Sequence, residues 1–119
     1  MRGIGSDIIE ISRIKNAYEK HGKKFLDRVF TQNEQNYCLS FKAPQERLAV
    51  RFAAKEAVAK ALGVGFGKDL SFLDIEIINL PSGKPEVILS SHLSFSFTSI
   101  HLSLSHCKEY ALAVAFIEN

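Results

Sequence analysis

The amino-acid sequence predicts an α+β domain in which helices lie against an antiparallel sheet. Three observations predict it: an alternating segment opens the chain, helical patterns fill its middle, and two strand pairs joined by short turns close it. Helices and antiparallel strands that occupy separate parts of a sequence are typical of α+β folds. The length of 119 residues suits a single domain, residues 1–119, since domain lengths cluster near about 100–150 residues.

The N-terminal segment, residues 2–9 (RGIGSDII), predicts a short strand because its side chains alternate between two faces. A helix is expected next, over about residues 10–18, and Gly22 is expected to end it. Its apolar residues at helical spacing are Ile11, Ile14 and Tyr18. Residues 25–30 carry further apolar residues that predict another turn or two of helix.

Two further helices are expected in the middle of the chain. Thr31 and Glu34 have the T-x-x-E spacing of a capping box, which predicts a helix over about residues 31–39. The longest helix is expected over about residues 45–62, where Gly63 ends it. The glycine-rich loop that follows matches no established phosphate-binding motif, so a helix end with a flexible turn is its simplest interpretation.

The C-terminal half predicts two hairpins, with strands at residues 74–80 and 85–89 and at residues 100–105 and 110–117. The PSGK turn, residues 81–84, joins the first pair, and a connection of hairpin length joins the second. Residues 92–99 match no pattern, so the sequence assigns them neither an element nor a role.

The composition excludes several classes of protein. Because 15 basic and 13 acidic residues give a formal charge of only +2, the chain has no overall charge that predicts nucleic-acid binding. No apolar run reaches the roughly 20 residues that span a bilayer, so no membrane association is expected. Cys38 and Cys107 lack the spacing of a zinc site or a disulfide framework, and they predict reduced thiols in a cytoplasmic protein.

The long helix has an unusual distribution of charge. Arg51 and Lys55 share one stripe, while Glu56 and Lys60 share another, roughly 140° away around the helix. A surface helix normally has a single polar face. The second stripe is therefore either an exposed ion pair worth a few tenths of a kcal/mol or a half-buried acid and base that face a ligand.

Asp7, near the end of the first strand, is the other candidate. Gly3 and Gly5 precede it, and their missing side chains would let a ligand or another backbone approach. Asp7 could instead cap the following helix. Asp7 and Glu56 together could hold Mg²⁺, which binds few protein carboxylates, although the residues alone give no reason for the two to meet.

Positive charge is concentrated in residues 13–28. Such a basic helical face could meet an acidic protein, a nucleic acid or a membrane surface, or it could simply be solvated. His106 lies at the end of a predicted strand, where it could face either solvent or a cleft.

Several segments resemble the small type of 4′-phosphopantetheinyl transferase, the family of the bacterial holo-acyl-carrier-protein synthases. They are GIGSDIIEISRI (3–14), FLDRVFTQNE (25–34), RFAAKEAVAKALGVG (51–65), SGKP (82–85) and SLSHCKEYALAVA (103–115). The resemblance covers nearly the whole chain in the right order. Val64 departs from it, because a small polar residue such as threonine is expected between these glycines.

The resemblance implies a 4′-phosphopantetheinyl transferase-like fold, in which an antiparallel sheet packs against a long helix. It also implies active sites between the subunits of a homotrimer. The implied reaction is a Mg²⁺-dependent step of fatty acid biosynthesis. The 4′-phosphopantetheine arm of coenzyme A passes to a serine of an acidic apo-acyl carrier protein, and adenosine 3′,5′-bisphosphate is released.

The resemblance also implies roles for single residues. Asp7 and Glu56 would bind Mg²⁺, and Glu56 and Lys60 would be catalytic. The expected coenzyme A contacts are Arg51, Lys60, Gly63, Ser82, Gly83, Lys84, Pro85 and His106. The expected contacts to the carrier protein are Arg13, Lys20, Lys23 and Lys24. The base for the carrier serine stays open between a metal-bound water and a carboxylate such as Glu56.

Two other functions fit parts of the sequence. A non-catalytic adaptor would bind an acidic protein through residues 13–28 without any dependence on coenzyme A. A nucleic-acid module would use the same face, and its affinity would fall steeply with salt. The presence of Asp7, Glu56 and Lys60 argues against the adaptor, and the nearly balanced charge argues against the nucleic-acid module.

Overall fold

The computed structural model describes residues 2–97 and 99–119, so Thr98, within the unassigned segment 92–99, lies outside the described residues. The elements, in chain order, are β1 (Gly3–Glu10), α1 (Ile11–His21), α2 (Lys23–Val29), α3 (Gln32–Leu39), α4 (Pro44–Leu62), the 3-10 helix η1 (Phe72–Asp74), β2 (Ile75–Asn79), β3 (Pro85–Leu89), β4 (Ser99–His106) and β5 (Tyr110–Glu118).

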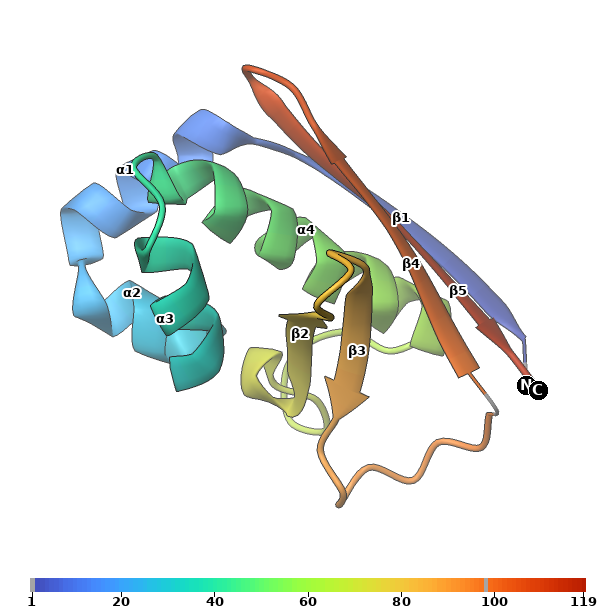
Figure 1. Ribbon diagram of the computed structural model, residues 1–119. Coiled ribbons are helices and arrows are strands. Elements are labelled where there is room, and N and C mark those ends of the chain that lie inside the picture. Colours follow the sequence, from blue (N-terminus) through green and yellow to red (C-terminus); the bar gives the residue numbers. More distant parts are fainter. Residues whose placement is uncertain (1, 98) are drawn as a thin grey trace.

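An antiparallel sheet with the strand order β1-β5-β4 forms one layer of the molecule, and α4 runs along its inner face (Figure 1). β2 and β3 form a separate hairpin beside α4, while α1, α2 and α3 gather at one end of it. The predicted α+β class, with a long helix against an antiparallel sheet, is therefore confirmed.

α4 approaches β1 unusually closely because two glycines lie at the contact. A Cβ atom on Gly3 would lie 2.0 Å from the carbonyl oxygen of Ala61, and one on Gly5 would lie 2.1 Å from that of Ala57. On β5 the residues that face α4 are also small, namely Ala111, Ala113 and Ala115, all fully buried. The sequence left open whether a ligand or another backbone approaches these glycines. The structure shows that it is the backbone of α4.

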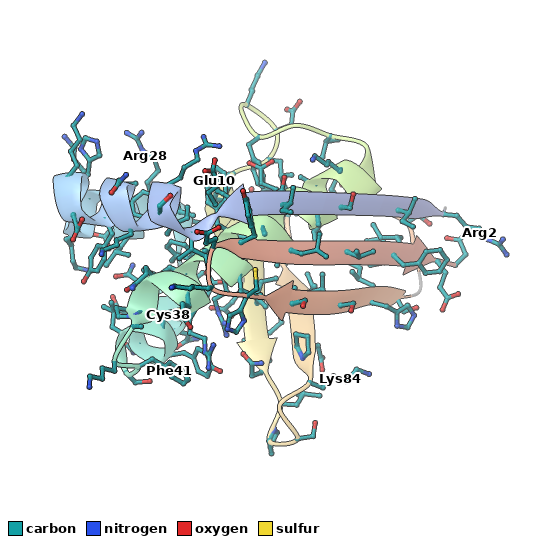
Figure 2. All side chains as sticks on the ribbon, turned by 90° about the horizontal axis from the view of Figure 1, so that it is seen from above. Arg2, Glu10, Arg28, Cys38, Phe41 and Lys84 are labelled. Atoms are coloured by element: carbon teal, nitrogen blue, oxygen red, sulfur yellow. The ribbon has the colours of Figure 1, made fainter. Side chains whose placement is uncertain are left out.

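The outer face of the sheet, which points away from α4, exposes large apolar side chains on β1 and β5. β1 contributes Ile4 and Ile8, which are 70% and 63% exposed. On β5 the exposed large residues of this face are Tyr110, Leu112 and Phe116. Strand register aligns Ile4 with Phe116 and Ile8 with Leu112, so two apolar pairs cross β1 and β5 with the Ser6–Val114 pair between them. Figure 2 looks down on the sheet from this side.

A buried ion pair joins the helical end of the molecule to α4 and β2. The Nζ atom of Lys55 donates to three oxygens, Glu34 Oε1 at 2.7 Å and the carbonyl oxygens of Val29 at 2.6 Å and Phe72 at 3.0 Å. Glu34 Oε2 accepts from the backbone N–H of Ile77 at 2.9 Å. Glu34 also completes the predicted capping box with Thr31, whose N–H donates to Glu34 Oε1 at 2.8 Å. This network holds elements from α2 to β2 in one arrangement.

Most predicted elements are present with shifted ends. α1 begins at Ile11, and its N-cap residue is Glu10, which makes no side-chain capping bond. Asp7 lies within β1 instead, so its alternative role as a helix cap is wrong. The strand expected from Asp74 begins at Ile75, because Asp74 closes the one-turn helix η1 by accepting from the Ser71 N–H at 2.9 Å. The described residues between Leu89 and Ser99 form neither helix nor strand.

Candidate active site

Asp7, Glu56 and Lys60 meet where β1 crosses α4. The Lys60 Nζ atom lies 3.3 Å from Asp7 Oδ1 and 3.0 Å from the carbonyl oxygen of Ser6. The Asp7 side chain is 17% exposed and that of Lys60 is 55% exposed. Glu56, one helical turn before Lys60, is half-buried. The Gly5 contact sets this geometry, since it brings the β1 backbone against the side of α4 that carries Glu56 and Lys60.

The electrostatics of this Asp7–Glu56–Lys60 cluster favour a bound cation. Burial raises the pKa of Glu56 above its ordinary value of 4.5; repulsion from Asp7 adds to the rise, and the Lys60 ammonium opposes it. In the described part of the chain, the ion pair of Lys60 is with Asp7 and none is formed with Glu56. The sequence alternative of an exposed Glu56–Lys60 pair is therefore not what the structure contains.

The donor set of the cluster fits a hard divalent cation. Two carboxylates contribute only oxygen donors, and Mg²⁺ typically takes one or two protein carboxylates and fills its other positions with water and phosphate oxygens. Among residues 2–97 and 99–119, no group of three or more histidine, cysteine, aspartate or glutamate side chains could hold a metal. A zinc site of three or four protein ligands is therefore absent from the described residues.

Arg51 occupies a second site, on another side of α4. Its side chain is 3% exposed, and its Nη2 donates to Asn79 Oδ1 at 2.6 Å. The guanidinium carbon lies 4.3 Å from the centre of the Tyr37 ring. In the described chain the Nε atom of Arg51 is buried without a hydrogen-bond partner. Buried donors are nearly always paired in native proteins, so this free donor points to a ligand.

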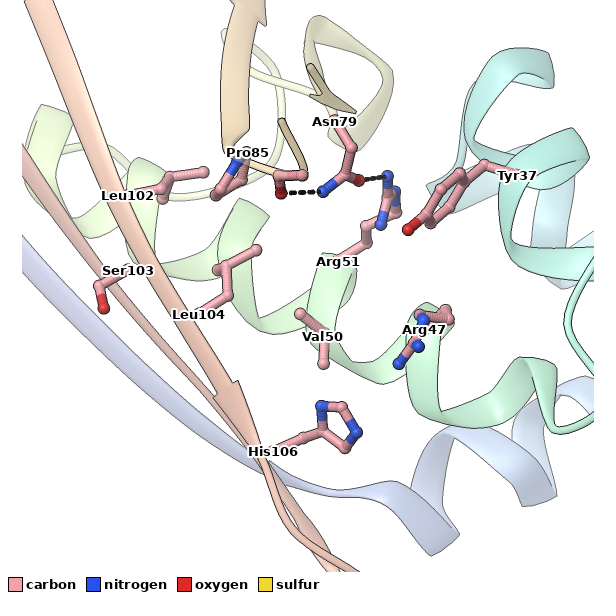
Figure 3. A pocket seen from close by; sticks show the side chains of 11 residues that line it. Tyr37, Arg47, Val50, Arg51, Asn79, Pro85, Leu102, Ser103, Leu104 and His106 are labelled. Carbon is pink, nitrogen blue, oxygen red and sulfur yellow. Dashed lines mark hydrogen bonds between the residues drawn. The ribbon is translucent and has the colours of Figure 1, made fainter. Parts of the chain in front are cut away.

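Arg51 lines a pocket of about 380 Å³. The wall residues come from α3, α4, the β2–β3 hairpin and β4, and they are Tyr37, Arg47, Val50, Arg51, Asn79, Gly83, Pro85, Leu102, Ser103, Leu104 and His106. Figure 3 shows Arg51 between Tyr37 and Asn79, with His106 across the pocket. Two arginines and a histidine in one pocket suit a ligand with phosphate groups.

The predicted coenzyme A contacts divide between this pocket and its surroundings. Arg51, Gly83, Pro85 and His106 line the pocket. Ser82 and Lys84 lie in the same β2–β3 turn, where the Lys84 N–H approaches the Ser82 hydroxyl at 3.4 Å, but they are not wall residues. Gly63 ends α4 with a φ of 78°, a left-handed conformation that favours glycine. The need for a left-handed residue at the end of α4 is therefore enough to explain why a glycine is present at position 63.

The two groups of residues lie at opposite edges of the sheet. Asp7 belongs to the edge strand β1, whereas Leu102, Leu104 and His106 belong to the other edge strand, β4. β5 separates them, so the two edge strands are about 10 Å apart at the usual strand spacing. The Asp7–Glu56–Lys60 cluster and the Arg51 pocket therefore form two separate sites in one chain.

The predicted carrier-protein contacts are exposed on α1 and α2. Arg13, Lys20, Lys23 and Lys24 are all solvent-accessible. Lys23 forms an ion pair with Asp27 at 2.8 Å, which leaves the other three without a carboxylate within salt-bridge distance among the described residues. Beside them, His21, Lys24, Phe25 and Arg28 line a hollow of about 190 Å³. This surface is basic with one aromatic residue in it.

The pocket also contains residues that the sequence reasoning missed. Tyr37, Arg47 and Asn79 were not candidates. Arg47 precedes Arg51 by four residues, so its helical spacing could have identified it. Tyr37 and Asn79 carried no such signal, because only the packing of α3 and β2 against α4 places them beside Arg51.

Within the described ranges, no helix is long and apolar enough to cross a membrane.

Comparisons with known proteins agree with this geometry. Residues 3–115 match the family described as the 4′-phosphopantetheinyl transferase superfamily. The chain is 56% identical over 115 residues to the holo-[acyl-carrier-protein] synthase of Protochlamydia amoebophila, covering 95% of this chain and 94% of that protein. The Chlamydia pneumoniae synthase is 52% identical over 114 residues, with 94% and 93% covered.

Solved structures show the same similarity. The holo-(acyl-carrier-protein) synthase of Bacillus anthracis, in complex with CoA (3′,5′-ADP), superposes with a TM-score of 0.85 at 45% identity, covering 98% of this chain and 96% of that one. The Helicobacter pylori synthase in complex with coenzyme A gives a TM-score of 0.89 at 39% identity, with 97% and 99% covered.

Proposed function

This chain belongs to the 4′-phosphopantetheinyl transferase superfamily, and from that premise we infer that it is a holo-acyl-carrier-protein synthase. It transfers the 4′-phosphopantetheine group from coenzyme A to a serine of apo-acyl carrier protein, in fatty acid biosynthesis, and releases adenosine 3′,5′-bisphosphate. The observation that carries this function is the meeting of Asp7, Glu56 and Lys60 across the β1–α4 contact.

The reaction explains why the chain needs no nucleophile of its own. The serine hydroxyl of the carrier protein gives its proton to a water or carboxylate at the site, and its oxygen forms a bond to the phosphorus that bears the pantetheine arm. The bond from that phosphorus to the bridging oxygen breaks, and adenosine 3′,5′-bisphosphate leaves with the electron pair. Negative charge grows on the leaving phosphate, so positive groups held at that point lower the barrier.

Asp7 and Glu56 are the residues that hold Mg²⁺ in this proposal. Their oxygen-only donor set and the mutual repulsion that contributes to the raised pKa of Glu56 support the assignment. When bound, the ion neutralises pyrophosphate charge. Lys60 places its ammonium beside the same carboxylates and adds positive charge where the coenzyme A phosphates lie.

The Arg51 pocket holds the adenosine 3′-phosphate end of coenzyme A. The buried free Nε of Arg51 supports this role, as does His106 on the opposite wall. His106 is itself held 3.6 Å from Glu46 at the start of α4. Gly83 and Pro85 of the β2–β3 turn line this subsite, Ser82 and Lys84 lie beside them in the same turn, and Gly63 ends α4 three residues after Lys60.

We propose that two copies of the chain share each complete site, since the Asp7–Glu56–Lys60 cluster and the Arg51 pocket lie on opposite edges of one sheet. Different patches of two copies can meet in a head-to-tail contact, and such contacts form a ring when the rotation between copies closes. We therefore assign the homotrimer of the family to this chain. The exposed apolar outer face, with Ile8 63% exposed, supports this assembly, since large exposed apolar patches mark interfaces.

The basic surface of α1 and α2 receives the acidic carrier protein in this proposal. Arg13, Lys20 and Lys24 are exposed there, and charge complementarity of this kind raises the association rate.

The two cysteines are free, and this supports a cytoplasmic location, where thiols stay reduced.

Mass spectrometry of the carrier protein tests the function directly. Incubation of apo-acyl carrier protein with this chain, coenzyme A and Mg²⁺ is expected to add the mass of one phosphopantetheine. Asp7→Ala and Glu56→Ala should each abolish the gain while leaving the circular dichroism spectrum intact. Glu86→Ala, which removes an exposed carboxylate of β3, is the matched control and should retain activity. Normal activity in both site variants would refute the metal assignment, and binding of the carrier without any mass gain would indicate an adaptor.

A further inference from the structure

We propose that Asn79 is a positioning residue that orients Arg51 toward the 3′-phosphate of the nucleotide and so lets the pocket discriminate 3′-phosphorylated from unphosphorylated adenosine. The proposal rests on the proposed function for the identity of the nucleotide. Asn79 is the last residue of β2, immediately before the turn that forms one wall of the pocket.

Asn79 makes one contact with each side of the pocket (Figure 3). Its Oδ1 atom accepts from Arg51 Nη2 at 2.6 Å, and its Nδ2 atom donates to the carbonyl oxygen of Gly83 at 3.0 Å. The amide therefore connects α4 with the β2–β3 turn. Gly83 has a φ of 91°, so the turn has a fixed and unusual backbone at the point where Asn79 holds it.

The surroundings of Arg51 leave its orientation dependent on Asn79. The guanidinium carbon lies over the Tyr37 ring, 4.3 Å from the ring centre. The attraction of a cation to a ring face is not directional, so it does not fix where the guanidinium N–H groups point. The bond to Asn79 supplies the directional constraint. With that constraint in place, the Nε atom stays buried and unpartnered among the described residues.

The neutral amide has a second consequence. An aspartate at this position would also accept from Arg51, but it would neutralise the guanidinium charge and strengthen that bond into an ion pair. An amide orients Arg51 and leaves its full positive charge for the ligand. Among the described residues, the guanidinium forms no ion pair within 4.0 Å. Asn79 therefore suits a pocket in which Arg51 must bind an anion.

Binding of two nucleotides distinguishes an orienting role of Asn79 from a general role in stabilising the fold. Adenosine 3′,5′-bisphosphate carries the 3′-phosphate and adenosine 5′-monophosphate lacks it, so the ratio of their dissociation constants measures recognition of that phosphate alone. The ratio is taken by isothermal titration calorimetry on one protein preparation, and partial unfolding of a variant cancels from it. The wild-type chain should prefer the bisphosphate.

Two substitutions test the residue. Asn79→Ala removes the orienting contact, and Asn79→Asp keeps the shape but adds a charge that pairs with Arg51. Both should lower the preference for the bisphosphate, Asn79→Asp by about tenfold or more, which corresponds to about 1.4 kcal/mol. In the transfer assay the same variants should raise the KM for coenzyme A and leave the KM for 3′-dephospho-coenzyme A nearly unchanged.

Asn36→Asp is the matched control, because it makes the same chemical change on the exposed face of α3. The Oδ1 atom of Asn36 accepts from Gln32 at 2.8 Å, an interaction that aspartate preserves. This control should keep the wild-type ratio. An unchanged ratio in both Asn79 variants, or a wild-type chain without any preference for the bisphosphate, would overturn the proposal. Absence of carrier modification with an intact nucleotide preference would instead refute the proposed function and leave the role of Asn79 standing.

Discussion

The Nζ atom of Lys55 lies 2.7 Å from Oε1 of Glu34, and neither side chain is exposed to solvent. Burial lowers the pKa of Lys55, and the Glu34 carboxylate opposes that change. A buried pair of this kind is stable only when both partners are present, because a single charge left in the interior is not compensated. Lys55 immediately precedes Glu56 on α4, so this pair also fixes the part of the helix that carries the candidate active site.

Removing one partner of this pair should cost more than removing both charges. Lys55→Met is expected to lower the free energy of unfolding by about 3–5 kcal/mol, since Glu34 would stay buried and unpaired. The double variant Glu34→Gln/Lys55→Met retains neither charge of this pair and should recover part of that loss. Urea denaturation followed by circular dichroism gives both values. A double variant no more stable than Lys55→Met would contradict this explanation.

The contact between β1 and α4 should tolerate no side chain at Gly5. In Gly5→Ala the new Cβ atom would lie 2.1 Å from the carbonyl oxygen of Ala57, so the helix would have to move. Overpacking of this kind typically costs about 1–3 kcal/mol, and the displacement of α4 should also separate Glu56 from Asp7 and reduce activity. Thermal unfolding and the transfer assay measure the two effects.

Gly65→Ala is the control for that substitution, because a Cβ atom there would meet nothing within 4 Å. It should be neutral or stabilise the protein by up to about 1 kcal/mol, since alanine restricts the unfolded chain. Equal effects of the two glycine substitutions would show that the β1–α4 contact does not limit stability.

Assembly should depend on the apolar outer face of the sheet. Ile8→Asp places a carboxylate in the middle of that face, where Ile8 is 63% exposed, and burying it at an interface would be costly. The variant is expected to be monomeric by size-exclusion chromatography with light scattering, and to lose transfer activity because the proposed site is shared between two copies. Leu39→Asp, on the 41% exposed Leu39 of α3, should change neither property. A trimeric, active Ile8→Asp variant would place the interface elsewhere.

Glu56→Gln should stabilise the metal-free protein at neutral pH. The folded-state pKa of Glu56 lies above its ordinary value of 4.5, chiefly through burial, so the fold disfavours the charged form. This cost is absent below pH 4.5 and develops as the pH rises through the folded-state pKa. The free energy of unfolding of the variant should therefore equal that of the wild-type protein in acid. At higher pH it should be larger, by less than about 1 kcal/mol for a half-exposed group.

Thermal melts in EDTA across this pH range measure the difference. Addition of Mg²⁺ should then raise the melting temperature of the wild-type protein and have little effect on Glu56→Gln, because a ligand that binds only the folded state stabilises it. A metal-free variant that is less stable than the wild-type protein at neutral pH would contradict the raised pKa of Glu56.

The two cysteines should differ strongly in reactivity. Burial raises the pKa of Cys38 to about 11, whereas Cys107 is exposed in the β4–β5 turn. Since the thiolate is the reactive form, iodoacetamide at about pH 8 should modify only Cys107 in the folded protein. Peptide mass spectrometry after labelling, with and without urea, measures this. Rapid labelling of Cys38 in the native state would show that its surroundings open readily.

Local patterns determined much of this protein. The capping box of Thr31 and Glu34, the helix end at Gly63 and the alternation of the strands all depend on neighbours a few residues apart, so the sequence predicted these elements with small shifts at their ends. The roles of Asp7 and Glu56 came from the resemblance to a family, because periodicity could not bring two residues from distant segments together.

The tertiary structure alone decided how these elements meet. Lys60 and Asp7 are 53 positions apart, and they pair because Gly5 lets the β1 backbone touch α4. The helical pattern placed Lys55 on the stripe of Arg51, but only the folded chain surrounds it with Glu34 and two carbonyl oxygens. Such contacts depend on the close packing of several elements at once, and a sequence read along one element does not contain that information.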